Sequence, residues 1–230
     1  MLRVGLTGGL GSGKSTIAHF LRDLGADVIE SDELGRDLME PGHAVHDEIL
    51  RVFGPEVAGS DGRLNRARLA ELAFGKNRVR ELNAIVHPAV IDAQRRWMET
   101  VFARDPAAVA VVVSALIFEV ERDALAEGRS GLLADIRKRL DRVVLVTAPD
   151  DAKVARYIAR TRSAGTSQEA AEADARSRLA HQIPDAEKAA RADYIIENTG
   201  DMSFLRLQAL SLWERLKAES NKFSRDESLK

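Results

Sequence analysis

One short stretch, GLTGGLGSGKST at residues 5–16, combines the residue types that bind phosphate. The residues from Gly8 to Ser15 fit the pattern G-x4-G-K-S/T at every position. Glycine permits backbone angles that turn successive N–H groups inward around a phosphate. Lys14 can then reach the β- and γ-phosphates, and the Ser15 hydroxyl can ligate Mg²⁺. The residues expected to hold the nucleotide are Gly9, Leu10, Gly11, Ser12, Gly13, Lys14, Ser15 and Thr16.

The sequence around this loop agrees with a nucleoside triphosphate site. An apolar run at 3–7 predicts a strand before the loop, and an amphipathic pattern predicts a helix from Lys14 onward. A helix that begins there directs the positive end of its dipole at a bound anion. The alternative is a glycine-rich turn that contains G-K-S by chance, and the strand-loop-helix order favours the phosphate site over it.

A carboxylate stands just beyond the second predicted strand. Asp32 follows the run at 27–30, and the carboxyl ends of neighbouring parallel strands face one crevice. In that place Asp32 can take the proton of an acceptor hydroxyl, or hold Mg²⁺ through water. Ser31 or Asp32 can equally cap the helix that opens with SDEL. Position alone leaves both interpretations open.

Arginines gather late in the chain, around a Gly-Thr-Ser turn at 165–167. They are Arg156, Arg160, Arg162, Arg176 and Arg178. Arginines on a hinged pair of helices neutralise charge on a transferring phosphoryl group and exclude water. The alternative is a solvated helical surface with pairs such as Glu172 and Arg176. For the cluster as a whole, beside a phosphate-binding loop, we expect a lid.

His87 precedes Pro88 within NAIVHPAV at residues 83–90. Pro88 suits the first turn of the helix that follows, so His87 would either cap that helix or face an acceptor. The other four histidines show no spacing of a metal site.

Five apolar runs predict the strands that must position these residues. They lie at 3–7, 27–30, 109–116, 142–148 and 193–197, and helical patterns separate them. Alternation of strands and helices predicts a parallel sheet wrapped by helices, an α/β fold. The tract 33–103 lacks a strand signal and is expected to form a helical insertion. A second helical segment is expected at 120–141, with breaks at Gly128 and Gly131.

Composition bounds the class of protein. The chain has 34 basic and 36 acidic residues, a net charge of −2, so bulk charge suggests neither a nucleic-acid nor a membrane partner. The absence of cysteine excludes disulfides, thiolate metal sites and a cysteine nucleophile. The longest apolar run, at 107–118, is too short to span a bilayer, and no signal peptide opens the chain. These features predict a cytoplasmic enzyme, and they leave its oligomeric state open.

The remaining motifs discriminate among proteins with such a loop. The segment IIENTG at 195–200 lacks a guanine-recognition signature, and the chain is too short for a motor with its partner regions. A phosphate-binding loop, a helical insertion after the second strand and an arginine-bearing lid together favour a small-molecule kinase. A kinase for some other nucleoside or metabolite, and a regulatory ATPase, are the alternatives.

These pieces together resemble the dephospho-CoA kinase family. The stretches that carry the resemblance are VGLTGGLGSGKSTIAHFLRDLGADVIESDELGRDLMEPG (4–42), RELNAIVHPAV (80–90), ALIFE (115–119), RVVLVTAPDDAKVARYIAR (142–160) and RLAHQIPDAEKAARADYIIENTG (178–200). The glycine-rich start and the I-x-H-P element are specific in combination. The sequence departs from the family at Ala115, where the family has proline, and at Asn83, where it often has glutamate.

The resemblance implies a reaction and a fold. The reaction is ATP-dependent phosphorylation of the ribose 3′-hydroxyl of dephospho-CoA to CoA and ADP, with Mg²⁺. The fold is a P-loop NTPase fold of the nucleoside-monophosphate-kinase type, with a five-stranded parallel sheet flanked by helices. One kinase domain, 1–230, would consist of a core (1–32, 104–160 and 183–220), an acceptor-binding insertion (33–103) and a lid (161–182).

The resemblance also implies roles for single residues. Glu30-Ser31-Asp32 matches an Asp-x-Asp element whose second acid is the proposed base, so Asp32 would be the base here. The implied catalytic residues are Lys14, Asp32 and Arg160; the implied substrate-binding residues are Asp32, Arg80, His87, Arg156, Arg178 and Gln182; and Ser15 would ligate the metal.

Overall fold

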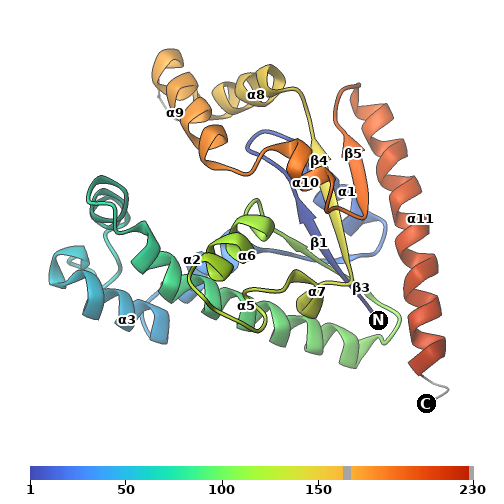
Figure 1. Cartoon of the computed structure of the whole chain (residues 1–230), viewed down its shortest axis with the longest axis horizontal. Helices are drawn as coiled ribbons and strands as arrows, with labels where there is room; N and C mark the ends of the chain where they lie inside the picture. The colour runs from blue at the N-terminus through green and yellow to red at the C-terminus, as the bar shows by residue number, and fades with distance from the viewer. Residues whose placement is uncertain (163–166, 228–230) are drawn as a thin grey trace. The chain divides into compact units, whose positions relative to one another are not determined.

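The fold is built on a five-stranded sheet. The computed structural model describes residues 1–162 and 167–227. The strands are β1 Leu2–Thr7, β2 Asp27–Glu30, β3 Val109–Val113, β4 Arg142–Thr147 and β5 Tyr194–Glu197. They are ordered β2-β3-β1-β4-β5, and β1 pairs in parallel with β3 and β4, as β4 does with β5 (Figure 1). The predicted α/β fold is confirmed, and each strand lies at its predicted run.

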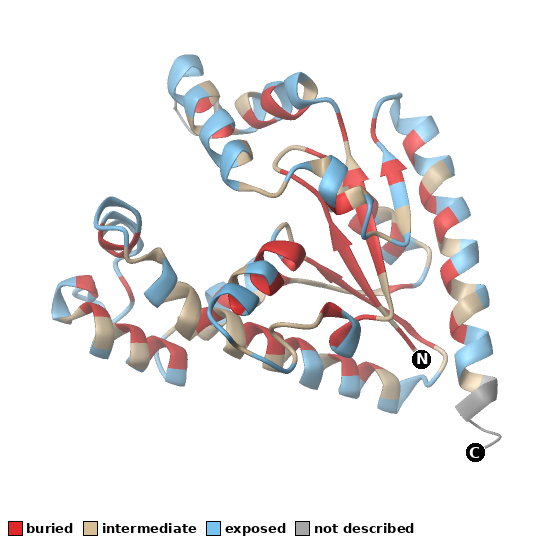
Figure 2. Cartoon of the chain, viewed as in Figure 1, coloured by how far each residue is buried: buried red, intermediate tan, exposed pale blue. Residues whose placement is uncertain are grey.

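Two helices cover one face of the sheet. These are α1, Lys14–Asp23, and α11, Met202–Glu227. Successive side chains of a strand point to opposite faces, so every second residue of β1 enters the same core. Val4 is fully buried there with Leu21 of α1 and Leu216 of α11. The central strands are buried along their length, as strands covered on both sides must be (Figure 2).

The other face is covered by α6, Ile117–Ala126, and α7, Ile136–Arg139. Gly5 of β1 faces them at close range. A Cβ atom at Gly5 would lie 2.7 Å from Ile117 Cδ1 and 2.6 Å from Leu140 Cδ1. The absence of a side chain at this position therefore lets the helical layer approach the strand.

The segment at 120–141 is interrupted where the sequence predicts. Gly128 and Gly131 have φ of 69° and 77°, and they follow the end of α6. The helix of this segment begins earlier than predicted, at Ile117, so the segment is not separate from the helical layer on the sheet. Phe118 of α6 and Ile136 of α7 are buried in one cluster. This segment is part of the layer that covers the sheet.

The predicted lid, 161–182, lies among the helices that connect β4 to β5. They are α8 Asp150–Arg162, α9 Gln168–His181 and α10 Asp185–Ala189. Val154 and Tyr157 of α8 pack with Ala175 of α9 in a small core of their own. Most of the predicted Gly-Thr-Ser turn, and the side chain of Arg162, lie outside the described residues.

The chain divides into two compact units. The first comprises Met1–Ile29 with Met98–Lys230, and the second comprises Glu30–Trp97. The sheet, apart from Glu30 at the end of β2, and helices α8 and α9 belong to the first unit, whereas Asp32, Arg80 and His87 belong to the second. The division of the chain into a core, an insertion and a lid stays a prediction.

The second unit is helical, as expected for the insertion. Its helices are α2 Ser31–Leu38, α3 Ala44–Phe53, α4 Arg66–Ala70 and the first part of α5 Val79–Arg104, with a 3₁₀ turn at Pro55–Val57 and a π-helical turn at Glu71–Gly75. Ile49 and Phe53 of α3 pack against Leu72 and Val86 in one apolar cluster. The unit therefore has a hydrophobic core of its own.

The prediction for Pro88 is wrong. Pro88 lies inside α5, which begins at Val79, so it does not open a helix and His87 does not cap one. Proline inside a helix lacks the N–H that would bond to the carbonyl four residues earlier. Val86 and Val90, on either side of Pro88, are both buried in the cluster of the second unit. Burial on both sides offsets the lost hydrogen bond and keeps the helix continuous.

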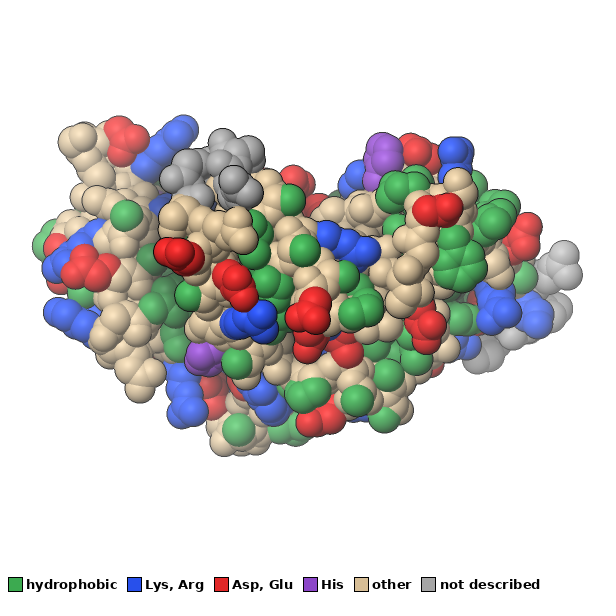
Figure 3. Space-filling view, turned by 90° about the horizontal axis from the view of Figure 1, so that it is seen from above, with side chains coloured by type: hydrophobic (Ala, Val, Ile, Leu, Met, Phe, Trp, Pro, Cys, Tyr) green, Lys and Arg blue, Asp and Glu red, His purple; other side chains and the backbone are tan. Residues whose placement is uncertain are grey.

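On the face drawn in Figure 3, basic and acidic side chains are interspersed rather than gathered by sign. None of the helices in the described residues has the length and apolarity of a membrane span.

Candidate functional site

The phosphate-binding loop joins the end of β1 to the start of α1, where the sequence places it. Gly11 has φ of +70° and Gly13 has φ of +101°, which L side chains rarely adopt. A Cβ at Gly11 would lie 2.3 Å from the backbone oxygen of Lys153, and one at Gly13 would lie 2.3 Å from Asn198 Nδ2. Glycine is therefore required at both positions for conformation and for space.

Side chains from later elements hold the loop in place. Asn198, the residue after β5, donates from Nδ2 to the carbonyl of Ser12 at 2.8 Å. Arg156 of α8 donates to the carbonyl of Gly11 at 3.3 Å and to Asn198 Oδ1 at 3.2 Å. Gln182, after α9, accepts from the N–H of Leu10 at 3.3 Å. Two of the predicted binding residues, Arg156 and Gln182, are thus brought to the loop.

Lys14 and Ser15 begin α1 beside the loop. Lys14 Nζ donates to the carbonyl of Gly9 at 3.3 Å. Ser15 is exposed in the first turn of the helix, where N–H groups have no partner within the helix. A hydroxyl open to solvent is an oxygen ligand of the kind that Mg²⁺ accepts. The residues present here fit a magnesium-bound triphosphate.

A buried ammonium that the sequence analysis did not single out lies beside the loop. The side chain of Lys153 is 4% exposed, and Nζ donates to Asp185 at 2.7 Å and to Asp150 at 2.9 Å. Thr147 Oγ1 donates to the same Asp185 oxygen at 2.6 Å. Burial lowers the pKa of Lys153, but the hydrogen bonds to the two carboxylates outweigh it, and the pKa lies above its ordinary value. Lys153 is therefore charged at neutral pH.

The lid arginines surround one tyrosine. The guanidinium groups of Arg160 and Arg178 lie 5.4 and 5.8 Å from the centre of the Tyr157 ring. Asp174 of α9 accepts from the Tyr157 hydroxyl and pairs with Arg178 at 3.0 Å. The hydrogen bond from Tyr157, with the Arg178 contact, holds the pKa of Asp174 below its ordinary value. The structure thus brings Arg160 and Arg178 together across the two lid helices.

Arg176 is part of a solvated helical surface, which was the alternative to a phosphate-binding role. Arg176 donates to Glu172 at 2.9 Å across one helical turn. This is the pair that a solvated helical surface predicts.

In the second unit, Asp32 lies in the first turn of α2 and is exposed. The residue that precedes the helix is Glu30, and no side chain caps it. Ser31 is instead buried, and its hydroxyl accepts from Gln94 at 2.9 Å. The capping interpretation of Ser31 and Asp32 is therefore wrong, which leaves the Asp32 carboxylate open to solvent.

Arg80 and His87 both lie on α5, also in the second unit. They are seven residues apart, which is about two helical turns, so they share one face of the helix. Arg80 is exposed and His87 is half-buried.

Sequence reasoning missed three residues that hold the loop or its surroundings: Asn198, Lys153 and Asp185. Asn198 could have been found, because it follows a predicted strand at the carboxyl edge of the sheet. Lys153 and Asp185 are 32 residues apart, and no local pattern links them.

The comparisons with known proteins agree with this geometry. The family model CoaE, dephospho-CoA kinase, matches residues 2–203. The dephospho-CoA kinase of Corynebacterium diphtheriae is 38% identical over 213 residues, covering 92% of this chain and 96% of the relative. That of Anaeromyxobacter dehalogenans is 42% identical over 198 residues, covering 86% and 83%.

Solved structures extend the likeness to three dimensions. The crystal structure of TT1252 from Thermus thermophilus has a TM-score of 0.67 at 34% identity, covering 92% of this chain and 96% of that one. The dephospho-CoA kinase of Campylobacter jejuni has a TM-score of 0.55 at 19% identity, which supports the fold. The matched residues include the phosphate-binding loop and helices α8 and α9, and by this evidence of sequence and structure the chain belongs to the dephospho-CoA kinase family.

Proposed function

We propose that this chain transfers the γ-phosphoryl group of ATP to the ribose 3′-hydroxyl of dephospho-CoA, giving CoA and ADP. The observation that carries the proposal is the glycine loop at 8–15, held by Asn198, Arg156 and Gln182 in a chain of this family. A loop fixed in this way presents its N–H groups and the positive end of α1 to one anion.

The residues of the first unit bind the triphosphate. Lys14 leaves the Gly9 carbonyl and binds the β- and γ-phosphates, and Ser15 would hold Mg²⁺. The metal ion, when bound, neutralises charge on the phosphates. Arg160 and Arg178 neutralise charge on the transferring group from the lid. Catalysis rests mainly on position and charge rather than on covalent chemistry.

Asp32 is the proposed base. Its carboxylate takes the proton of the 3′-hydroxyl while that oxygen forms a bond to the γ-phosphorus. The bond from the γ-phosphorus to the bridging oxygen of ADP breaks, and ADP leaves with the electron pair. Arg80 and His87 bind the acceptor. The location in the cytoplasm and the lack of nucleic-acid or membrane partners stay predictions from composition.

The experiment that tests the proposal is a coupled ADP-release assay with Mg·ATP, with and without dephospho-CoA, and with the product identified by mass. ADP release that depends on dephospho-CoA and yields CoA supports it. Lys14→Ala should abolish that signal, whereas Lys222→Ala, an exposed lysine of α11, should not. ADP release that is equal without the acceptor, or greater with another nucleoside or metabolite in an acceptor panel, would overturn it.

A further inference from the structure

An ion pair between Lys153 and Asp185 joins the helices on the two sides of the predicted lid, 161–182. Lys153 lies on the outgoing helix α8, and Asp185 begins α10 after the returning helix α9. Their side chains meet at 2.7 Å, with Lys153 4% and Asp185 20% exposed. Thr147, the last residue of β4, donates to the same carboxylate oxygen at 2.6 Å. The pair, together with Thr147, therefore links α8 and the start of α10 to the end of β4.

Each member of the pair lies three residues from a contact with the phosphate-binding loop. Arg156, three residues after Lys153, donates to the Gly11 carbonyl. Gln182, three residues before Asp185, accepts from the N–H of Leu10. A shift of the pair would therefore also move Arg156 or Gln182, which hold the loop.

Lys153 also touches the loop directly. Its backbone oxygen is 2.3 Å from where a Cβ at Gly11 would stand, and its Nζ is 3.6 Å from the corresponding point at Gly9. Lys153 therefore lies close to the loop at two positions, Gly9 and Gly11. A buried ammonium in this place requires its carboxylate partner, because an unpaired buried charge is strongly unfavourable.

We propose that Lys153 and Asp185 are positioning residues, which fix the base of the lid against the phosphate-binding loop so that the loop and the lid arginines meet the triphosphate in one geometry. The proposal deepens the proposed function and rests on it for the turnover readout. Neither side chain is assigned a contact with substrate, because each is paired with the other at 2.7 Å.

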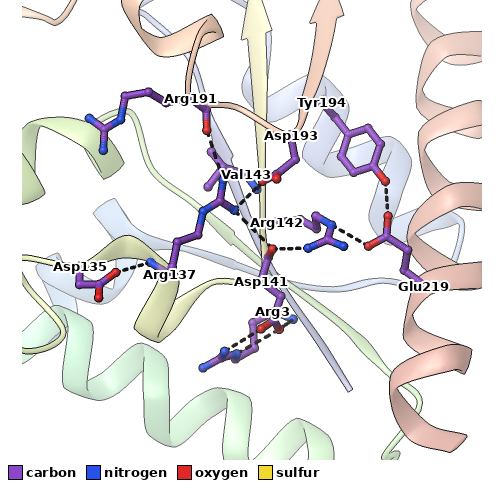
Figure 4. Close-up of polar contacts among 10 residues, drawn as sticks. All are labelled: Arg3, Asp135, Arg137, Asp141, Arg142, Val143, Arg191, Asp193, Tyr194 and Glu219. Carbon is purple, nitrogen blue, oxygen red and sulfur yellow. Dashed lines mark hydrogen bonds and ion pairs between the residues drawn. The ribbon is translucent and has the colours of Figure 1, made fainter. Parts of the chain in front are cut away.

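The test compares two neutralised ion pairs. The variant Lys153→Met with Asp185→Asn removes both charges and keeps side-chain size, so that no buried charge is left alone. The control, Arg3→Met with Asp141→Asn, removes the pair drawn in Figure 4, whose side chains meet at 2.6 Å. Arg3 lies near the amino end of β1, and the loop follows the carboxyl end of that strand. Thermal unfolding shows that each variant folds, and calorimetry with Mg·ADP measures nucleotide affinity without any acceptor.

We expect the Lys153/Asp185 variant to lose on the order of 10-fold in Mg·ADP affinity and 10- to 100-fold in kcat, as a misplaced binding group does. Its KM for dephospho-CoA should change less than about 2-fold, since the acceptor residues are untouched. The Arg3/Asp141 control should keep wild-type affinity and kcat. Wild-type nucleotide affinity in a folded Lys153/Asp185 variant, or an equal loss in the control, would overturn the proposal.

A milder variant decides the matter if the double substitution does not fold. Thr147→Val removes one hydroxyl donor to Asp185 and keeps the shape of the side chain. We expect a loss of Mg·ADP affinity in the same direction, and wild-type affinity would overturn the proposal. Because calorimetry needs no acceptor, a wild-type enzyme that fails to phosphorylate dephospho-CoA would refute the proposed function while these affinities still judge the positioning role.

Discussion

At the scale of single residues, the loop depends on glycines for two separable reasons. Gly11 and Gly128 have almost the same φ, +70° and +69°, so a side chain at either would be strained. At Gly11 a Cβ would also collide with the backbone of Lys153, whereas at Gly128 it would meet nothing within 4 Å. A substitution at Gly128 therefore tests conformational strain alone, whereas one at Gly11 tests strain together with a steric collision.

We expect Gly11→Ala to lower nucleotide affinity by on the order of 10-fold or more, because the loop must move away from Lys153. Gly128→Ala should cost about 1–2 kcal/mol of stability through strain alone and leave affinity and kcat unchanged. Calorimetry with Mg·ADP and thermal unfolding measure both effects. Equal affinities for the two variants would show that the collision at Gly11 is relieved without consequence for the loop.

The role of Asp32 makes a second prediction at this scale. Asp32→Asn keeps the size of the side chain but removes its capacity to accept a proton, so kcat should fall by on the order of 10²- to 10⁴-fold. Affinity for Mg·ADP should remain, because the nucleotide is held by other residues. Asp37→Asn, at another exposed position of α2, is the matched control and should be as active as wild type. Full activity of Asp32→Asn would remove this carboxylate from its role.

At the scale of elements, helix α5 shows where sequence reasoning is limited. Pro88 suggests a helix start by its local chemistry, yet the helix continues through it because Val86 and Val90 are buried on both sides. Local propensity was outweighed by packing that the sequence pattern does not reveal. Strands β3 and β4, by contrast, were predictable, because continuous runs of buried aliphatic residues are typical of strands covered on both faces.

Replacing Pro88 tests this interpretation of α5. Pro88→Ala restores an N–H donor and improves helix propensity, so it should stabilise the fold by about 1–3 kcal/mol. Pro55→Ala, at the first position of a 3₁₀ turn where proline is favourable, should be neutral or slightly destabilising. Thermal unfolding of both variants supplies the measurement. A lower melting temperature for Pro88→Ala would mean that the helix has adapted to the proline.

At the scale of the whole molecule, the sequence predicted what depends on local order and missed what depends on distant pairing. The loop from Gly8 to Ser15 is visible because its residues are contiguous. Arg156 was predicted as one of the arginines that gather late in the chain, and Gln182 through the resemblance to a family. Lys153 and Asp185 were not found, because their relation exists only after α9 has returned to the sheet.

The response of the fold to acid brings scattered charges into one measurement. Hydrogen bonds from neighbouring arginines are the largest cause that lowers the pKa of Glu48, Glu81 and Asp92. The hydrogen bond from Tyr157, with the contact of Arg178, lowers the pKa of Asp174. A carboxyl group whose pKa is lower in the folded chain stabilises the fold above its unfolded pKa, about 4. That contribution is lost as the pH falls through the folded pKa. Lys153, with a raised pKa, acts oppositely and stabilises the fold until the pH rises past its unfolded value, about 10.4.

The melting temperature should therefore be nearly constant between about pH 6 and 9 and should fall below about pH 4. Asp174→Asn serves as the probe, because asparagine keeps a hydrogen-bond acceptor for Tyr157 but cannot ionise. Its melting temperature should lie below that of the wild type at pH 7, and the gap between the two curves should narrow as the pH falls below about 4, the unfolded pKa, towards the lowered pKa of Asp174 in the folded chain. Salt should narrow the difference at pH 7, since Asp174 and Arg178 are both largely exposed. A gap between the two curves that stays constant from pH 7 to pH 3 would show that Asp174 acts through its shape and not through its charge.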